Sequence, residues 1–361
     1  MTTFRSLIAI AAKKRWQIYQ LDVNNAFLHG DLHEEVYMKA PPGLDLKLPN
    51  LVCKQNKSLY RLKQASRQWY DKFTEAMYTR GYTYSMHNYS VFYKKQDSST
   101  VFVAVYVDDV LLTGTNLEEI SQLKAFLHDR FKIKDLGQLH YFLGLEVLYK
   151  EDGIIISQRK FILDLMKEYD CLHSTSLASP LNPTMKLKAK EASPLSDPTF
   201  YRRLVGKLNF LTNIILDIAY GVQYLSQFMQ DPREPHLHAA YHMLRYLKKD
   251  PTLGMYFRNT SDLSITAYCD SDWTACPDSR RSVSGYIVLL GGSPVSWKSK
   301  KQETMSLSSA EAEYRALRKV LGELVWLHRL FEELTVPVSL PIPIHYDSQS
   351  ALHIARKSCI P

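Results

Sequence analysis

The stretch VFVAVYVDDVLLTG at residues 101–114 constrains the fold more than any other part of the sequence. Two apolar runs flank the adjacent Asp108 and Asp109, so the pattern predicts a buried β-hairpin with carboxylates at its crest. A surface turn tolerates aspartate, but two-residue hairpin turns favour Asn-Gly or Asp-Gly, because their central residues need positive φ. Neighbouring carboxylates repel one another, and a divalent cation such as Mg²⁺ relieves that repulsion. These residues alone support a metal site and a plain turn about equally.

Length and composition are those of a globular protein. The 361 residues predict two or three domains, and 45% hydrophobic with 23% charged residues suffice for buried cores. The formal net charge of +8 favours an anionic partner, with nucleic acid first and an acidic membrane surface second. Many soluble proteins are mildly basic without such a partner, so the charge alone does not identify one.

Neither the cysteines nor the N-terminus indicates secretion or a membrane anchor. Five cysteines are scattered without a C-x-x-C pair, which argues against a zinc module or a disulfide framework and favours a reducing compartment. In MTTFRSLIAIAAKKRW the basic residues follow the apolar run, and the run is too short for a membrane span. We expect a buried amphipathic helix there, in an intracellular protein with no signal peptide or transmembrane segment.

The spacing of apolar residues predicts the elements of the first half of the chain. A strand over 16–23 ends in Asp22, and a helix over 58–81 begins near Ser58 and stops at Gly81. A second helix is predicted over 117–131. A strand pair is predicted around 140–149.

The sequence pattern of the second half of the chain changes twice. The stretch 178–200 carries four prolines and few large apolar residues, so it is the best linker candidate, and 200–250 is helical in pattern. Short strands then precede a long helix over 308–334, and a last strand over 342–347 ends near an acidic residue.

Three aspartates of the first half are predicted to meet. Asp22 ends one strand, Asp108 and Asp109 lie on the hairpin, and adjacent strands would bring them to one edge of a sheet. Three carboxylates can hold two Mg²⁺ ions, which suits attack by a 3′-hydroxyl and departure of pyrophosphate. Phe27, five positions beyond Asp22, is close enough to wall a nucleotide pocket, although a lone phenylalanine is more often a core residue.

Four stretches in order, QLDVNNAFLHGDLHEEVYMKAPPG, SLYRLKQASRQWY, YVDD and HYFLGLEV, resemble the reverse transcriptase of Copia-type LTR retrotransposons. The resemblance implies an RNA-directed DNA polymerase whose metal ligands are Asp22, Asp108 and Asp109, with two Mg²⁺ or Mn²⁺ ions per site. The implied partners are an RNA template, a DNA primer, an RNA–DNA hybrid and dNTPs, with no membrane. HYFLGLEV would be the primer grip.

The same resemblance assigns roles around the nucleotide. It implies that Phe27 senses the sugar 2′ position, that Gln64 contacts the incoming nucleotide, and that Tyr106 flanks the template-primer. Taken alone, Gln64 would be a solvated helix residue. The basic residues Arg61, Lys63 and Arg67 would likewise form a solvated face, although their interleaved aromatics suit nucleic-acid contact.

A second acidic set follows in AYCDSDW, LSSAEAEYRAL and HYDSQSA, which resemble the ribonuclease H domain of the same family. The resemblance implies cleavage of RNA in RNA–DNA hybrids, with Asp270, Glu311 and Asp347 as ligands of two further ions. Asp272 and Glu313 are weaker candidates for metal ligands. Two residues along a strand move a side chain by about 6.6 Å, and helix positions i and i+2 point to different faces.

The expected fold class is α+β. A reverse-transcriptase palm with an antiparallel-rich sheet, flanking helices, partial fingers and the start of a thumb is expected over 1–177. A linker and helical thumb or connection is expected over 178–260. A ribonuclease H-like α/β domain lacking its C-terminal end is expected over 261–361.

Three departures from the family pattern leave two main hypotheses open. The chain opens shortly before Asp22, it stops before the fourth ribonuclease H acid, and Ile215 and Leu216 stand where the family reads Arg-Pro. One hypothesis is an enzyme with both activities. The other is a truncated, catalytically inert nucleic-acid-binding relic. A stand-alone nuclease is a more distant third.

Overall fold

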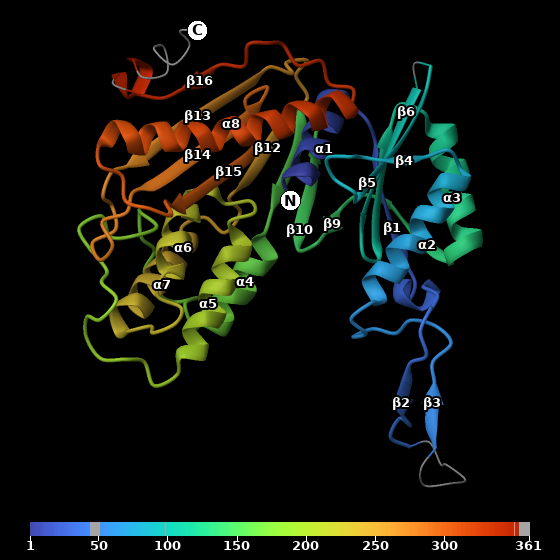
Figure 1. The fold of residues 1–361 in the computed structure, drawn as a ribbon, viewed down its shortest axis with the longest axis horizontal. Helices are drawn as coiled ribbons and strands as arrows, with labels where there is room; N and C mark the ends of the chain where they lie inside the picture. Colours follow the sequence, from blue (N-terminus) through green and yellow to red (C-terminus); the bar gives the residue numbers. More distant parts are fainter. Residues whose placement is uncertain (44–50, 98, 350, 354–361) are drawn as a thin grey trace. The chain divides into compact units, whose positions relative to one another are not determined.

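The computed structural model describes residues 1–43, 51–97, 99–349 and 351–353. The chain divides into two compact units, Trp16–Leu139 and a larger unit formed by Met1–Arg15 with His140–Pro361. The elements of both units are labelled in Figure 1. This division follows neither of the expected boundaries, after residue 177 and after residue 260, and those sequence-defined segments stay a prediction. The mixed α+β architecture with antiparallel sheets agrees with the predicted fold class.

The smaller unit is built on a six-stranded sheet in the order β4-β5-β6-β7-β1-β8, with every neighbouring pair antiparallel. The strands are β1 Ile18–Val23, β4 Thr83–Tyr84, β5 Val91–Gln96, β6 Ser99–Tyr106, β7 Asp109–Gly114 and β8 Ile133–Gln138. Helices α2 (Ala65–Thr79) and α3 (Leu117–Phe131) share one apolar core with this sheet. The predicted hairpin at 101–114 is therefore present, buried between β5 and β1.

Helix α3 has its predicted bounds, and the Asn116 side chain caps it by accepting the Glu119 N–H at 3.0 Å. Helix α2 is shorter than expected. It begins at Ala65 instead of Ser58, because Arg61 adopts a left-handed conformation with φ 76°, which breaks the helical path. Gly81, at φ 76°, follows the helix as predicted.

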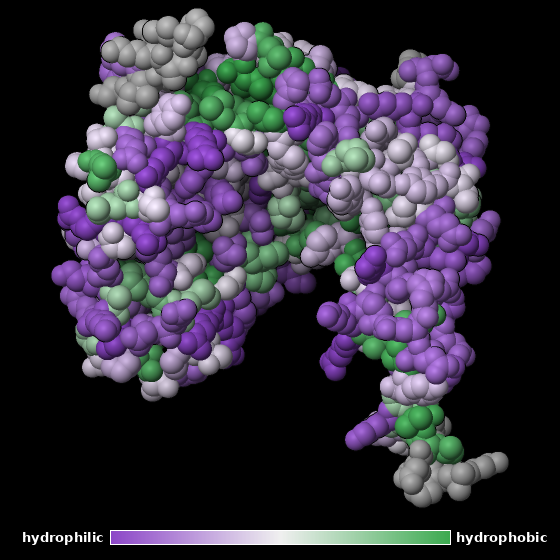
Figure 2. Space-filling view, in the orientation of Figure 1, coloured by the Kyte–Doolittle hydropathy of each residue, from purple (hydrophilic) through white to green (hydrophobic). Residues whose placement is uncertain are grey.

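A short antiparallel pair, β2 (Tyr37–Lys39) and β3 (Val52–Lys54), also belongs to this unit. Its surface carries a hydrophobic area in Figure 2, and Leu51 and Val52 are 46% and 56% exposed. The region between the two strands lies partly outside the described residues.

The larger unit contains two four-stranded sheets. One has the order β12-β11-β10-β9, formed by β9 Tyr141–Phe142, β10 Leu145–Lys150, β11 Gly153–Ser157 and β12 Gly254–Arg258. The N-terminal helix α1 (Thr2–Lys13) is buried, as its apolar run predicted. Arg5 is buried with it, donates to the Val295 carbonyl at 2.9 Å, and lies 3.8 Å from the centre of the Trp297 ring.

Four helices form a second core in this unit: α4 Arg159–Glu168, α5 Pro198–Leu211, α6 Ala219–Ser226 and α7 Glu234–Leu247. The segment predicted as a linker packs against these helices. Its prolines agree with the absence of regular structure before Pro198, but Leu187 is only 3% exposed and its N–H donates to the Tyr224 hydroxyl at 2.8 Å. This irregular strap, residues 178–197, has no helix or strand and covers one side of the helical core.

The second sheet has the order β15-β14-β13-β16, with β13 antiparallel to β14 and parallel to β16. Its strands are β13 Ile265–Asp272, β14 Val283–Leu290, β15 Ser293–Lys301 and β16 Ile344–His345. Helix α8 (Ser309–Glu333), capped by Ser308, lies on this sheet and matches the predicted helix over 308–334. No helix in the described part of the chain is both long and apolar enough to cross a membrane.

Candidate active sites

The hairpin between β6 and β7 closes with a two-residue turn, because Tyr106 pairs with Asp109. The central residues are therefore Val107 and Asp108, and Asp109 is the first residue of β7. Val107 has φ 56°, which is unusual for a β-branched residue. The indole N–H of Trp69 in α2 donates to the Val107 carbonyl at 2.6 Å. Backbone strain of this kind gathers at functional sites, where the surrounding structure holds it in place.

Pairing of β1 with β7 places Asp22 opposite Asp109, and the Val23 N–H donates to the Asp108 carbonyl at 2.8 Å. The Gln20 amide donates to Asp109 Oδ1 at 3.0 Å. Burial raises the pKa of Asp109, and the charges of Asp108 and Asp22 raise it further against the effect of the Gln20 hydrogen bond. All three aspartates thus lie at one end of these strands.

An aromatic pair lies beside these aspartates. Phe27, on the short helix η1 (Ala26–His29), has its ring centre 4.6 Å from that of Tyr60. Burial raises the pKa of Tyr60, and Asp108 and Asp22 contribute to the shift, so its hydroxyl lies within their field. Tyr60 is 47% exposed and was not singled out from the sequence. The feature of the sequence that could have identified Tyr60 was an aromatic side chain next to the basic residue Arg61.

The other two residues predicted to bind nucleotide or template lie on the same unit. Gln64 precedes α2, and its amide donates to Glu34 Oε1 at 2.8 Å. Tyr106 ends β6 and is 56% exposed. The predicted primer grip HYFLGLEV covers β9 and the start of β10 in the larger unit.

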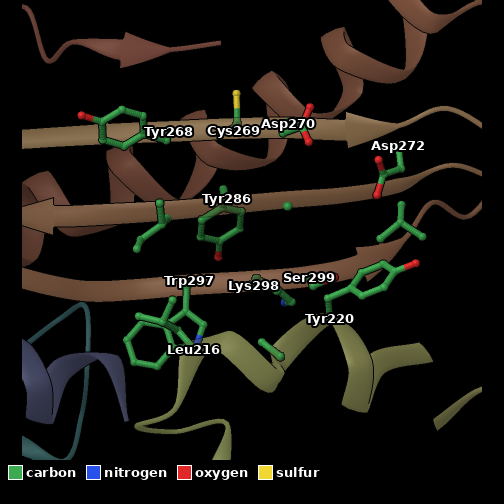
Figure 3. A pocket seen from close by; sticks show the side chains of 14 residues that line it. Leu216, Tyr220, Tyr268, Cys269, Asp270, Asp272, Tyr286, Trp297, Lys298 and Ser299 are labelled. Atoms are coloured by element: carbon green, nitrogen blue, oxygen red, sulfur yellow. The ribbon is translucent and has the colours of Figure 1, made fainter. Parts of the chain in front are cut away.

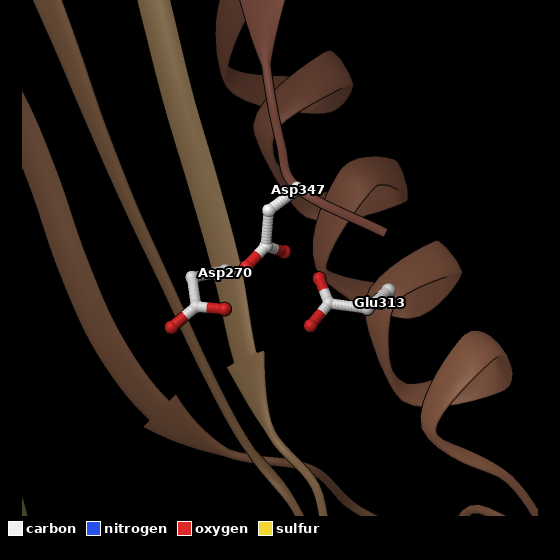
Figure 4. Close-up of side chains that lie close together, drawn as sticks. All are labelled: Asp270, Glu313 and Asp347. Carbon is white, nitrogen blue, oxygen red and sulfur yellow. The ribbon is translucent and has the colours of Figure 1, made fainter. Parts of the chain in front are cut away.

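A tighter acidic group lies in the larger unit. Asp270 in β13, Glu313 in α8 and Asp347 just after β16 each offer a carboxylate oxygen within 4.8 Å of the others, and Figure 4 shows the three carboxylates pointing toward one another. No other cluster of acidic, histidine or cysteine side chains this tight occurs among the described residues. Asp22, Asp108 and Asp109 are therefore more widely spread.

Glu311, expected in this group, is engaged elsewhere. Its N–H donates to the Ser308 hydroxyl at 3.1 Å, and its carboxylate accepts the Leu307 N–H at 2.8 Å. Arg315 donates to its other oxygen at 2.5 Å. The structure places Glu313, and not Glu311, beside Asp270 and Asp347. The S-x-x-E pattern of Ser308 and Glu311 was a capping signature that assigned Glu311 to the helix start.

Glu313 faces inward because it belongs to the apolar stripe of α8, one turn before Leu317 and beside Ala312 and Ala316. It is 8% exposed, its Oε1 accepts the Ser271 N–H at 3.2 Å, and its Oε2 has no hydrogen-bond partner within the described residues. Burial, and then the charge of Asp270, raises the pKa of Glu313 to about 7. An unpartnered buried carboxylate oxygen between two aspartates fits a divalent cation.

A buried amide holds the elements of this group together. Gln302 Nε2 donates to the hydroxyls of Ser271 at 3.2 Å and Ser284 at 2.9 Å, and to the Ala312 carbonyl at 3.0 Å. Its oxygen accepts from the Ser306 hydroxyl at 2.7 Å. Because the network joins β13, β14 and α8, it sets the spacing between Asp270 and Glu313.

A pocket of about 440 Å³ lies beside Asp270 in the same unit (Figure 3). Its walls include Tyr220, Tyr268 and Trp297, and Asp270 and Asp272 lie toward the end of β13. Asp272 lines this pocket and is not one of the three close carboxylates, in keeping with its lower rank.

Residues 1–183 match the sequence model of a family described as reverse transcriptase (RNA-dependent DNA polymerase). The chain is 41% identical, over 98% of its length, to the retrovirus-related Pol polyprotein from transposon RE1 of Arabidopsis thaliana, and covers 24% of that protein. It is 34% identical, over 99% of its length, to the corresponding polyprotein from transposon TNT 1-94 of Nicotiana tabacum, and covers 28% of it. A putative transposon Ty5-1 protein of Saccharomyces cerevisiae is covered completely, at 32% identity over 84% of this chain. The chain thus spans about a quarter of the two Pol polyproteins.

Proposed function

Because the chain belongs to the reverse transcriptase family and is homologous to the Pol polyproteins of Copia-type retrotransposons, we propose that it carries out RNA-directed DNA synthesis at Asp22, Asp108 and Asp109. The observation that carries the proposal is the pairing of Asp22 with Asp109 next to a strained turn held by Trp69. The partners proposed for this activity are an RNA template, a DNA primer and dNTPs, in agreement with the net charge of +8.

The side chains around this site orient its carboxylates. Gln20 fixes the direction of the Asp109 carboxylate, and the Val23 and Trp69 bonds fix the turn that carries Asp108. When bound by these carboxylates, Mg²⁺ or Mn²⁺ neutralises phosphoryl charge and lowers the pKa of an attacking hydroxyl. Phe27 and Tyr60 form a wall on which a nucleotide sugar or base can pack. Gln64 and Tyr106 are proposed contacts to the nucleotide and the template-primer.

We further propose a ribonuclease H-like site at Asp270, Glu313 and Asp347, which cleaves RNA in an RNA–DNA hybrid. Three observations support it: the three carboxylates converge from strand β13, helix α8 and the segment just after β16, Glu313 Oε2 lacks a hydrogen-bond partner among the described residues, and a buried amide network holds the helix to the sheet. The same class of divalent cation suits this donor set. In the cation-free protein the pKa of Glu313 is raised to about 7, and a bound cation would favour its ionised form.

Primer extension on an RNA template tests the polymerase proposal. The whole chain is assayed with Mg²⁺ and then Mn²⁺, beside Asp109→Asn and the control Asp129→Asn, an exposed position in α3. We expect template-dependent incorporation that Asp129→Asn keeps and Asp109→Asn loses. Folded wild-type protein that never incorporates nucleotide would overturn the proposal and support the inert relic, and so would full activity in Asp109→Asn.

Cleavage of a hybrid with labelled RNA tests the second site. Asp270→Asn is compared with Asp272→Asn, because both aspartates lie near the end of β13 and only Asp270 belongs to the group of three. We expect Asp270→Asn to abolish cleavage and Asp272→Asn to retain most of it. Equal loss in both variants, or no cleavage by the wild type, would contradict this assignment.

A further inference from the structure

The two flanks of helix α8 carry opposite charge near its N-terminal end. Glu313 faces Asp270 and Asp347 on one flank. Positions 315, 319 and 323 follow one another at intervals of four and form a separate row, since residues two apart on a helix point to different faces. In that row Glu323 accepts a hydrogen bond from the Ser296 hydroxyl of β15 at 2.5 Å. This second flank therefore faces strand β15, the end strand of the sheet.

Strand β15 presents lysines to that flank. Lys298 and Lys300 lie two and four residues beyond Ser296, and alternation along a strand puts the three side chains on one face. Both lysines are exposed. Burial lowers the pKa of Lys319, and Lys300 and Lys298 lower it further, which shows that the three ammonium groups share one electrostatic field. We call Lys298, Lys300 and Lys319 the lysine flank.

The lysine flank lacks matching anions. None of its three side chains forms an ion pair or a hydrogen bond within the part of the chain that the structure describes. Glu303 acts on Lys319 without forming an ion pair, and Arg315, also nearby, is occupied by Thr304 and Glu311. Three cations that repel one another favour a polyanion, because phosphates neutralise them and release counterions.

The spacing of the two flanks suggests which polyanion fits. A helix with its side chains is about 10–12 Å across, so the acidic group and the lysine flank are about a helix width apart. A nucleic-acid duplex carries two phosphate backbones, one on each side of a groove, and an RNA–DNA hybrid has the wide, shallow minor groove of A-form geometry. A groove laid over the start of α8 brings one backbone to each flank.

We propose that Lys298, Lys300 and Lys319 bind the phosphates of the DNA strand of an RNA–DNA hybrid whose RNA strand lies at Asp270, Glu313 and Asp347. The inference rests on the proposed ribonuclease function and adds to it the residues that hold the uncleaved strand. Exposed lysines on an end strand supply point charges without base contacts, so the binding is independent of sequence.

Single-turnover cleavage by the whole chain tests the proposal, because the half-saturating protein concentration reports binding at this site. The triple variant Lys298→Ala, Lys300→Ala, Lys319→Ala is compared with Lys186→Ala, Lys188→Ala, Lys190→Ala, which removes the same charge from exposed positions of the irregular strap. We expect the lysine-flank variant to raise the half-saturating concentration tenfold or more, with the rate at saturation unchanged. The logarithmic salt dependence should fall by about 0.9 per lost phosphate contact. The control should match the wild type.

Neutral methylphosphonate linkages identify the strand. Placed in the DNA strand, they should weaken binding by the wild type and should not weaken the lysine-flank variant further. Unchanged half-saturation and salt dependence in the lysine-flank variant, or an effect of neutral linkages confined to the RNA strand, would overturn the proposal.

The experiments distinguish failure of the proposed nuclease function from failure of the proposed phosphate binding by the lysine flank. If the folded wild type does not cleave, the nuclease proposal fails. Fluorescence anisotropy with the same hybrid then still tests the surface. Equal affinity and equal salt dependence of the lysine-flank variant and its control would reject the surface as well.

Discussion

Asp109 and Glu313 each belong to a group of three carboxylates, but their surroundings differ. Asp109 starts a strand, accepts a hydrogen bond from Gln20 and is half-buried next to Asp108 and Asp22. Glu313 is 8% exposed, has one unpartnered oxygen and has its pKa raised to about 7. The hairpin group has its oxygens further apart, whereas those of the second group lie within 4.8 Å.

The difference follows from how each group is assembled. The hairpin group needs one tight turn and one neighbouring strand, so hydrogen bonds between strands fix its positions. The second group joins a strand, a helix and a loop from positions 270, 313 and 347, and only tertiary packing brings them together. The cost of the hairpin group appears as backbone strain at Val107. The cost of the second group appears as a buried carboxyl oxygen of Glu313 without a hydrogen-bond partner among the described residues.

The largest expected effect separates the two glutamates of α8. Mutating even the partners of metal ligands costs roughly 10–100-fold, so Glu313→Gln is expected to slow hybrid cleavage by roughly 100-fold or more. Glu311→Gln should change the rate less than about fivefold, because that carboxylate caps the helix. Gel analysis of labelled RNA measures both. A larger loss in Glu311→Gln than in Glu313→Gln would reverse the assignment made from the geometry.

The second prediction concerns stability in EDTA. The folded-state pKa of Glu313, about 7, lies above its ordinary value of 4.5. Between these pH values the folded protein holds a proton that the unfolded chain releases, so stability falls as pH rises through this window and stays low above it. Glu313→Gln should therefore raise the free energy of unfolding at pH 8 by about 1–3 kcal/mol, with little gain at pH 4.

Urea unfolding monitored by tryptophan fluorescence measures this difference. Glu311→Gln is the matched control and should be mildly destabilising, because it removes the charge that pairs with Arg315, while the amide oxygen of glutamine can still accept the Leu307 N–H. An equal effect of Glu313→Gln at pH 4 and pH 8 would show that its carboxyl group does not titrate between them.

The smallest effect concerns the hairpin turn. A left-handed conformation costs an ordinary residue roughly 1–2 kcal/mol, so Val107→Gly should be more stable than Val107→Ala by about 1 kcal/mol. In an ordinary extended position glycine is the weaker choice by roughly 0.5–1 kcal/mol. Val105, half-buried in the same hairpin and without positive φ, is the control and should show the opposite order. Thermal unfolding checks both pairs, and the same order at both positions would remove the evidence for strain.

Local pattern predicted much of this protein. The apolar runs around Asp108 and Asp109 predicted the hairpin, and the spacing of apolar residues predicted the bounds of α3 and α8. In the structure Asn116 and Ser308 cap these two helices. These features depend on neighbours within a few residues, and short-range backbone geometry decides them.

Other features depended on packing between distant segments. Proline content suggested a linker, but Leu187 is buried against the helices, because a hydrophobic side chain there packs into a core that no local pattern reveals. Helix α2 is shorter than predicted by about two turns at its start, because Arg61 adopts a left-handed conformation.

The choice between Glu311 and Glu313 shows most clearly what the sequence determined and what tertiary packing decided. The sequence by itself determined that carboxylates from two strands and a helix would be available, and Ser308 with Glu311 already carried a capping pattern. Only the tertiary structure decided that Glu313 enters the group, because the face of α8 that packs on the sheet also faces Asp270 and Asp347. A helix turns by 100° per residue, so a choice between positions two apart depends on which face the sheet covers.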